Sequence, residues 1–552
     1  MAASASPDAG RLIADGRRLL DSGFFGDAVD VLRRAHAASP DAASARWLAR
    51  AQLAAGSIDE ADQTLAGGLA ASPDSAELAA LQADVALRRG RLDAAQTILD
   101  AAIRTAPETA ALLAKRGHLH LLAGEFAEAR RCLSRAIELD PADLAIRSDS
   151  ILAASQDPDV TTPALKRLQR RLAPPVASTP TFHIDRSLER PLRVGYVSSA
   201  FHRHATSKVI AAVLLRHDPA RVQTWCYSAA RRRDAASLRF RMAAEGWRGI
   251  AGMSDADAAQ AIRGDGIDVL VDLDGHYVGN RLGIFAQRAA PVQISAWGYV
   301  SGPGWPGIDY LLTDPVVVPP RERGDFPERL IDLPCAQPYD ATLMTRTPSA
   351  APAPHRPIRF GCFNRFDKLS PETLALWGRI LAASPGATLL LKNPYFAEAG
   401  PRERIVAALG RGGVDPNQVT CEGAEAQFAY LGAFSRIDVA LDPFPVSGGV
   451  TTLDGLSQGV PALTLAGLQP TGRITASILT WLGLGQCIAA SPDDYVRLAV
   501  ELGREPAQLA ALRGDVQAAW SRFSPAAMQS YAGAVEDAYD EIWARYLAEA
   551  QA

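Results

Sequence analysis

The order of apolar and polar positions divides this chain into a helical N-terminal part and a C-terminal part in which strands and helices alternate. In the first part, apolar residues recur at i, i+4 and i+7, as in Ala129, Leu133 and Ala136, which places them on one face of a helix. After Pro191 the pattern changes to short apolar runs separated by amphipathic stretches. The sequence therefore predicts two different architectures in one chain.

The helical part carries an internal repeat of 33 or 34 residues, in which glycine, alanine and proline keep the same phase. The repeated positions are Gly23, Gly56, Gly90 and Gly124, then Ala28, Ala61, Ala95 and Ala129, and then Pro40, Pro73, Pro107 and Pro141. This register is that of tetratricopeptide repeats, whose paired antiparallel helices stack into a superhelix with a concave groove. We expect four such repeats over residues 8–141, with a protein or peptide partner in the groove.

The C-terminal part predicts two successive α/β domains. Its first half contains the runs PLRVGYVSSAF, VQTWCYSA, IDVLVDLDG and PVQISAWGYV, and its second half contains IRFGCFN, ATLLLKN, IDVALDP and PALTLAG. Alternation of such runs with helices favours a parallel, doubly wound sheet in each half. We assign 142–190 to a helical transition and linker and 191–345 to the first Rossmann-like domain. A Pro/Ala-rich linker at 346–357 precedes the second domain, 358–552, which ends in a closing helix.

The expected fold class is thus an α tetratricopeptide superhelix followed by an α/β GT-B fold. In that fold two Rossmann-like domains face each other across a cleft. Glycosyltransferases have this architecture, and so do some epimerases and phosphorylases. The fold alone does not choose among these reactions.

Residues 442–461, DPFPVSGGVTTLDGLSQGVP, read as a strand that opens into a loop of small residues and then a helix. The strand ends at Asp442, and Ser447 to Gly449 supply little side-chain bulk. Such a junction brings backbone N–H groups and hydroxyls against a phosphate, whose charge the helix N-terminus favours. The spacing matches neither GxGxxG nor the Walker pattern, which argues against a NAD enzyme or an ATPase. A nucleotide site is expected here, with an ordinary strand-to-helix turn as the alternative.

Composition narrows the function classes further. A net charge of −4 and a pI near 6.2 give no electrostatic footprint for nucleic acid. The sequence shows no signal-peptide core and no run of 18 apolar residues, so we expect a cytoplasmic protein without membrane attachment. The six cysteines are scattered, with no Cys/His cluster at metal-ligand spacing. We therefore expect no metal ion and no other cofactor.

Four segments together resemble a known family. They are FHRHATS (201–207), DGHYVGNRLGIFAQRAAPVQISAWGY (274–299), FNRFDKLSPETLALW (363–377) and the loop 442–461. In order and approximate spacing they are similar to the tetratricopeptide-containing O-linked N-acetylglucosaminyltransferases, glycosyltransferase family 41, including the plant SPINDLY-like branch. The resemblance covers essentially the whole chain, repeats included.

The resemblance implies roles for individual residues. His204 matches an active-site histidine near the sugar, for which a general-base role suits an imidazole. Lys368 matches a lysine that stabilises the departing diphosphate, and Asp454 matches the acidic residue that accepts the ribose hydroxyls. The other nucleotide-sugar-binding residues that it implies are Arg365, His276, Gln427, Gly448, Gly449, Thr451, Thr452 and Arg473.

The chain also departs from the family pattern. Val450 stands where a threonine is usual, Ser447 where an asparagine is usual, and Ser457 where a tryptophan is usual. A hydroxyl lost at the phosphate removes a hydrogen bond to a charged acceptor, worth about 1.5–3 kcal/mol. Two further lysines of this half, Lys208 and Lys392, are expected on the surface or at sheet ends.

The hypothesis that best accounts for these observations is that the chain is an inverting, metal-independent glycosyltransferase. It would move a sugar, N-acetylglucosamine from UDP-GlcNAc being the first candidate, to Ser or Thr of a protein held by the repeats. One alternative keeps the fold and uses another donor (GDP-fucose, UDP-glucose or a nonulosonic acid nucleotide) or asparagine as acceptor. The other is a tetratricopeptide scaffold with weak catalysis.

Overall fold

A computed structural model describes residues 7–105, 108–176, 180–182, 190–343, 357–423 and 427–549. Most of the predicted linker at 346–357 therefore lies outside the described residues. The chain divides into two compact units, one formed by Met1–Ala153 with Gly249–Ser254 and the other by Ala154–Arg248 with Asp255–Ala552.

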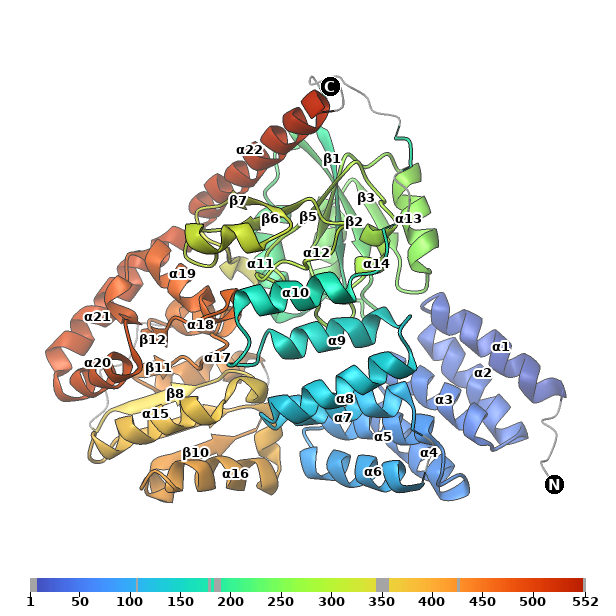
Figure 1. The fold of residues 1–552 in the computed structure, drawn as a ribbon, viewed down its shortest axis with the longest axis horizontal. Coiled ribbons are helices and arrows are strands. Elements are labelled where there is room, and N and C mark those ends of the chain that lie inside the picture. Colours follow the sequence, from blue (N-terminus) through green and yellow to red (C-terminus); the bar gives the residue numbers. More distant parts are fainter. Residues whose placement is uncertain are drawn as a thin grey trace. The chain divides into compact units, whose positions relative to one another are not determined.

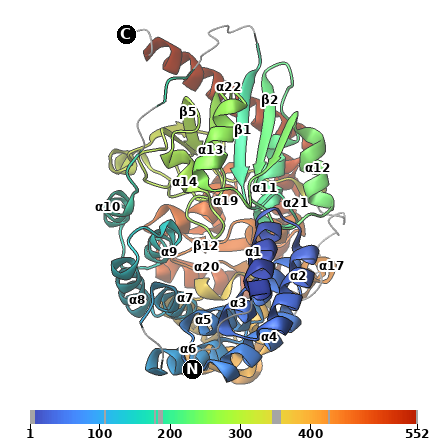
Figure 2. The same cartoon turned by 90° about the vertical axis from the view of Figure 1, so that its right-hand side faces the viewer.

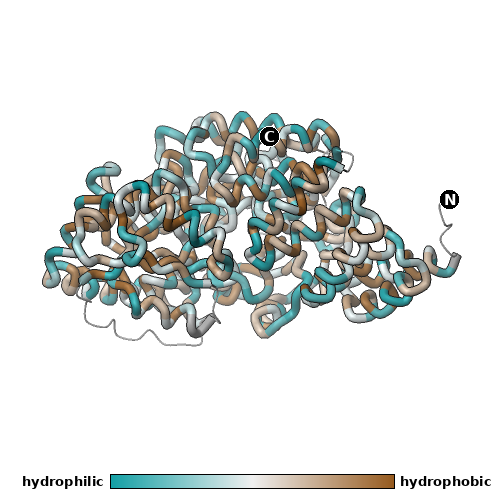
Figure 3. Tube along the Cα trace, turned by 90° about the horizontal axis from the view of Figure 1, so that it is seen from below, coloured by the Kyte–Doolittle hydropathy of each residue, from teal (hydrophilic) through white to brown (hydrophobic). Residues whose placement is uncertain are grey.

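The N-terminal unit is built from helices that pack against their neighbours in sequence order (Figure 1). They are α1 (Pro7–Asp21), α2 (Phe25–Ala38), α3 (Ala42–Ala55), α4 (Ile58–Ala71), α5 (Ala76–Arg88), α6 (Leu92–Thr105), α7 (Ala110–Leu122) and α8 (Phe126–Leu139), followed by α9 (Leu144–Ala154). In Figure 3, hydrophobic and hydrophilic positions alternate along the helices, as expected of amphipathic elements.

The repeated glycines and alanines have distinct physical roles. Gly23, Gly56, Gly90 and Gly124 have φ angles between 76° and 86°, a left-handed backbone that suits glycine where one helix ends. The phased alanines at 28, 61, 95 and 129 have no exposed surface, because the paired helix lies directly against them. Pro107, the phased proline of the third repeat, lies outside the described residues. The left-handed glycines and the buried alanines explain the repeat period of the sequence, and the paired helices confirm the tetratricopeptide architecture.

In the second unit, seven strands of the described chain form the first sheet, in the order β3-β2-β1-β4-β5-β6-β7. The strands are β1 (Leu192–Ser198), β2 (Val222–Ser228), β3 (Gly246–Gly249), β4 (Val269–Asp272), β5 (Val292–Ser295), β6 (Tyr310–Thr313) and β7 (Arg329–Asp332). Strand β1 pairs in parallel with both β2 and β4. The helices are α11 (Ala205–Leu214), α12 (Ala235–Ala243), α13 (Asp255–Gly264) and α14 (Leu282–Ala286), seen around this sheet in Figure 2.

The second sheet has six strands among the described residues, in the order β10-β9-β8-β11-β12-β13. They are β8 (Arg359–Cys362), β9 (Thr388–Lys392), β10 (Val419–Glu422), β11 (Val439–Leu441), β12 (Ala462–Leu465) and β13 (Ile488–Ala489). The helices are α15 (Pro371–Ala382), α16 (Ala399–Gly410), α17 (Gln427–Ala433), α18 (Val450–Ser457), α19 (Ile474–Leu482), α20 (Pro492–Arg504) and α21 (Pro506–Ala519). Two parallel α/β sheets after a helical repeat confirm the predicted fold class.

The closing helix, α22 (Pro525–Glu549), joins the second domain back to the first (Figure 1). Its Tyr539 hydroxyl lies 3.1 Å from the hydroxyl of Tyr196 on β1. Its buried Glu536 accepts a hydrogen bond from the backbone N–H of Asp218 at 2.9 Å. The two α/β domains are therefore held at a defined separation. No helix in the described part of the chain combines the length and apolar character needed to cross a membrane.

Candidate active site

The strand order of the second sheet reverses between β8 and β11. The chain runs outward from β8 through β9 to β10, and then returns to β11 on the other side of β8. Such a reversal leaves a crevice beyond the carboxyl ends of the two central strands, where doubly wound proteins bind ligands. A small cavity at this place is lined by Asn364 after β8, Asp442 after β11, and Thr451 and Thr452 of α18, among others. The predicted nucleotide loop thus lies at the reversal point.

Side-chain hydrogen bonds fix the loop that leaves β11. Asp442 Oδ1 accepts from the backbone N–H of Gly448 at 2.6 Å, and its Oδ2 accepts from Thr464 Oγ1 at 2.7 Å. Ser447 Oγ donates to the carbonyl of Thr471 at 3.0 Å and accepts from the backbone N–H of Ile474 at 3.1 Å. Burial raises the pKa of Asp442 to about 6. The small-residue loop is therefore preorganised.

The two glycines of the loop allow close approach to the start of α18. A Cβ atom on Gly448 would lie 2.2 Å from Thr452 Oγ1, and one on Gly449 would lie 2.4 Å from Gln337 Oε1. Gly449 is the N-cap residue of α18 and makes no side-chain cap hydrogen bond. The N–H groups of a helix's first turn have no intrahelical partner, so they remain available to an anion.

One positive side chain, Lys368, contacts this loop, and the charge of a second, Arg365, acts on Lys368. Lys368, which ends a 3₁₀ turn after β8, donates from Nζ to the carbonyl of Ser447 at 2.5 Å. Burial and the charge of Arg365 lower the pKa of Lys368 to about 8. Arg365 pairs with Asp367 at 3.1 Å, and its guanidinium carbon lies 5.8 Å from the ring centre of Tyr277. Such crowding of positive charge costs free energy unless an anion binds there.

The first sheet reverses its strand order between β1 and β4, and His204 follows β1 as the N-cap of α11. Its Nδ1 accepts a hydrogen bond from the backbone N–H of Thr206 at 3.2 Å. Burial and the charges of His202 and Arg365 lower the pKa of His204. A neutral imidazole that accepts at Nδ1 carries its proton on Nε2. In this geometry Nε2 is a hydrogen-bond donor and not a base. The guanidinium carbon of Arg365, which follows β8, lies 5.8 Å from the ring centre of Tyr277, which follows β4, so the two reversal points lie close together.

His276 has a structural position. The ring is completely buried, its Nε2 donates to the carbonyl of Pro303 at 2.8 Å, and it packs edge-on against Tyr299 and Trp305. Burial lowers its pKa to about 3, so the ring is neutral at physiological pH. The expectation that His276 contacts the nucleotide sugar is not supported, because the side chain holds the 299–305 segment in place.

Arg473 is likewise engaged within the protein. Its Nε donates to the carbonyl of Gly467 at 2.9 Å, and its two terminal nitrogens form a bidentate pair with Glu322 at 2.8 and 2.9 Å. The same nitrogens also donate to the carbonyls of Val317 and Leu468. Because a guanidinium has five N–H donors, all of them are used. The geometry gives Arg473 the role of tying the second domain to the first, in place of the expected contact with a nucleotide.

Asp454 is buried at the contact between the two α/β domains. Its Oδ1 accepts from Lys208 Nζ and from the Tyr339 hydroxyl, both at 2.6 Å. The prediction that Lys208 lies at the surface or at a sheet end is therefore wrong, because it lies within α11 and is 7% exposed. Lys392 does end β9, yet it too is buried and pairs with Glu422. Only five of the 57 basic residues are lysines, and this scarcity was the one sequence signal that a lysine such as Lys208 or Lys392 is buried and has a specific partner.

The remaining predicted contacts lie around α17 and α18. Thr451 and Thr452 lie in the first turn of α18, and Thr452 Oγ1 lies 3.0 Å from Thr475 Oγ1. Gln427 begins α17, but its side chain lies outside what the structure describes. Sequence reasoning missed Gln337, whose carboxamide reaches Gly449 from the segment after β7.

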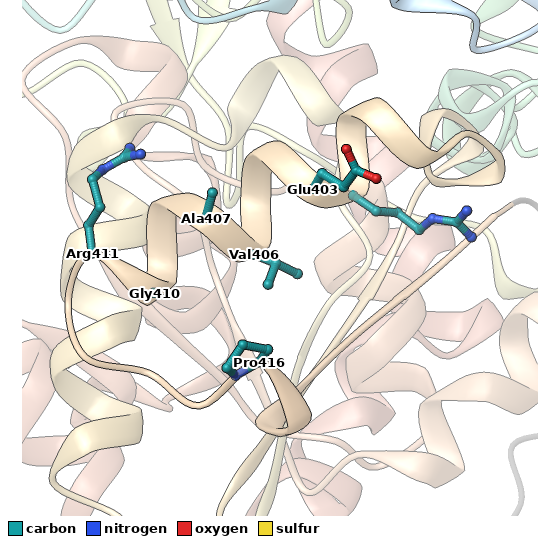
Figure 4. A pocket seen from close by; sticks show the side chains of 7 residues that line it. Glu403, Val406, Ala407, Gly410, Arg411 and Pro416 are labelled. Atoms are coloured by element: carbon teal, nitrogen blue, oxygen red, sulfur yellow. The ribbon is translucent and has the colours of Figure 1, made fainter.

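Another pocket, of about 600 Å³, lies on α16 and is drawn in Figure 4. Val406, Ala407, Gly410 and Pro416 give it an apolar floor. None of the predicted site residues lines it, and Glu403 and Arg411 lie on opposite sides of Val406 and Ala407 in Figure 4. The pocket therefore lacks convergent polar groups, and the reversal point between β8 and β11 remains the better candidate.

Known proteins resemble this chain in sequence and in structure. The family model of glycosyl transferase family 41 matches residues 176–337 and 336–535, and tetratricopeptide models match 19–85 and 110–143. The probable UDP-N-acetylglucosamine–peptide N-acetylglucosaminyltransferase SPINDLY of Arabidopsis thaliana is 34% identical over 370 residues, covering 65% of this chain and 40% of the relative. Its counterpart from Oryza sativa is 33% identical over 373 residues, covering 65% of this chain and 39% of the relative. The chain thus spans about 40% of the length of these curated relatives.

Among solved structures, a mutant of the Thermobaculum terrenum O-GlcNAc transferase superposes with a TM-score of 0.87 at 30% sequence identity. The match covers 92% of this chain and 98% of that chain, so repeats and both α/β domains correspond in one solved molecule. The family model, the relatives and the shared fold agree. The chain belongs to glycosyltransferase family 41.

Proposed function

We propose that this chain transfers a sugar from a nucleoside diphosphate to a Ser or Thr hydroxyl of a protein, with UDP-GlcNAc as the first candidate donor. The observation that carries the proposal is the reversal point between β8 and β11. There the uncapped N-terminus of α18 and the glycine loop lie beside Lys368, whose Nζ donates to the carbonyl of Ser447, and the charge of Arg365 lowers the pKa of Lys368. That combination suits a diphosphate. The names of the relatives, which are UDP-N-acetylglucosamine–peptide N-acetylglucosaminyltransferases, support protein as acceptor and UDP-GlcNAc as donor.

In the proposed reaction, the acceptor oxygen forms a bond to the anomeric carbon while the bond from that carbon to the diphosphate oxygen breaks. The electron pair leaves with the diphosphate, and the hydroxyl proton passes to solvent or to a basic group. Lys368 and the N-terminus of α18 stabilise the charge that grows on the leaving group. His204 donates a hydrogen bond from Nε2 to the sugar being transferred.

The proposed mechanism needs no metal ion, since Lys368 and Arg365 supply positive charge at the diphosphate. Among the residues that the structure describes, no three His, Cys, Asp or Glu side chains gather as a metal site. Asp272 and Asp274 have the spacing of a metal motif, but their carboxylates accept hydrogen bonds from Ser295 and Ser198 at 2.8 and 2.7 Å.

We further propose that the repeats hold the acceptor protein.

The test is a donor panel with a peptide library. The chain is incubated with UDP-GlcNAc, UDP-glucose, GDP-fucose or a nonulosonic acid nucleotide, and added sugar is detected by mass spectrometry. We expect transfer from one donor, undiminished by EDTA and reduced about 10²- to 10³-fold in Lys368→Met. Transfer that requires an added divalent cation would contradict the metal-independent mechanism. Absence of transfer from every donor would contradict the proposal itself.

A further inference from the structure

Gln337 lies in a segment whose backbone is firmly anchored. The segment follows β7, and its Ala336 N–H donates to Asp314 Oδ2 at 2.6 Å. One residue earlier, the carbonyl of Cys335 accepts from the Tyr531 hydroxyl at 2.7 Å. These contacts fix the backbone on the N-terminal side of Gln337.

The carboxamide oxygen of Gln337 is a buried acceptor that lacks a hydrogen-bond partner among the described residues. The residue is 9% exposed, so about nine-tenths of it is buried. Oε1 is also the atom nearest to the place where Gly449 would carry a Cβ, at 2.4 Å. It therefore lies against the N-cap residue of α18.

A buried polar atom without a partner is rare in folded proteins, and it commonly awaits a ligand or a water molecule. Oε1 accepts hydrogen bonds and donates none, so the group that satisfies it must carry an O–H or N–H. An ionised diphosphate has no such hydrogen. The sugar attached to that diphosphate does have one, on its hydroxyls or on an acetamide.

We propose that Gln337 is a sugar-binding residue whose Oε1 accepts a hydrogen bond from a hydroxyl or amide N–H of the sugar being transferred. The inference rests on the proposed function, because it takes the diphosphate to lie at the N-terminus of α18. It adds a second contact from the first α/β domain, besides that of His204, to a site whose diphosphate-binding part is built by the second. Gln337 then makes the chain bind a nucleotide sugar more tightly than the nucleotide without its sugar.

The experiment compares the Kd of the nucleotide with the Kd of its nucleotide sugar by calorimetry on the full chain. The pairs are UDP with UDP-GlcNAc, UDP with UDP-glucose, and GDP with GDP-fucose. Gln337→Met keeps the shape and removes the acceptor, whereas Gln337→Glu keeps acceptor oxygens. Gln458→Met, at the opposite end of α18, is the matched control. The ratio of the two Kd values cancels any effect on the diphosphate that both ligands share.

For the pair that the parent binds, we expect the preference for the nucleotide sugar to fall about tenfold in Gln337→Met, as for one lost hydrogen bond. It should change less than twofold in Gln337→Glu and in the control. The melting temperature without ligand should not fall in Gln337→Met, since no bond within the described protein is lost. An unchanged preference in Gln337→Met overturns this inference alone. A parent chain that binds none of the ligands overturns the proposed function, and the inference with it.

Discussion

At the scale of single residues, the protonation of Lys368 sets an upper pH limit for the reaction. Its folded-state pKa of about 8 lies below the ordinary lysine value of 10.5, so the ammonium is present at lower pH and is lost as the pH rises through 8. We expect kcat/KM to fall tenfold per pH unit above about pH 8. Lys368→Arg should be slower but should lose this alkaline limb, because a guanidinium keeps its proton. An identical limb in both proteins would assign the titration to another group.

Individual residues also show where sequence reasoning stops. Gly448 and Gly449 were predictable, because strand, small residues and helix follow each other directly in the sequence. The partners of Lys208, Arg473 and His276 were not, because each lies far away along the chain or is a backbone carbonyl. Neighbouring residues in the sequence predict the helix, strand or loop on which a charged residue lies. They do not predict its burial, which depends on the distant element that packs against it.

At the scale of elements, the junction between β11 and α18 should tolerate no side chain at Gly448. A Cβ there would meet Thr452 Oγ1 at 2.2 Å and Asp442 Oδ1 at 2.7 Å, so the loop would have to move. We expect Gly448→Ala to weaken nucleotide binding about tenfold or more while the protein still folds. Gly485→Ala is the control, since a Cβ there has nothing within 4 Å. Calorimetry that finds equal nucleotide affinity in both variants would contradict the role given to the loop.

The contact between α11 and α18 rests on the buried pair of Lys208 and Asp454. Lys208→Met should destabilise the fold by about 3–5 kcal/mol, because it leaves a buried carboxylate without its cation. Lys392→Met should cost less, since Glu422 keeps a second partner, Arg436, at 2.6 Å. Thermal melting of the two variants compares them. A Lys208→Met protein that melts like the parent would show that the pair adds no stability.

At the scale of the whole molecule, the order of domains was predictable because the pattern changes from helical periodicity to alternating strands and helices. The short strands β3, β6, β7, β10 and β13 were not identified, since two to four residues leave little pattern. The interface between the two sheets was also not predictable. It is built by Arg473 with Glu322 and by α22 on β1, which are contacts between distant segments.

The two units are proposed to divide the work between acceptor capture and chemistry. Deletion of residues 1–140 should therefore reduce glycosylation of a protein acceptor about tenfold or more, while hydrolysis of the donor changes little. Both rates are measured beside a melting curve, so that loss of fold is recognised. If a well-folded truncation glycosylates the protein as fast as the full chain, the repeats do not capture the acceptor.

The central claim is that a nucleoside diphosphate lies at the reversal point between β8 and β11. A crystal structure of the full chain with the diphosphate that raises its melting temperature most tests this directly. The account predicts phosphate oxygens within hydrogen-bond distance of Lys368 Nζ and of the backbone N–H groups at the start of α18. A nucleotide bound elsewhere, for instance in the pocket on α16, with the loop 447–449 unoccupied, would contradict it.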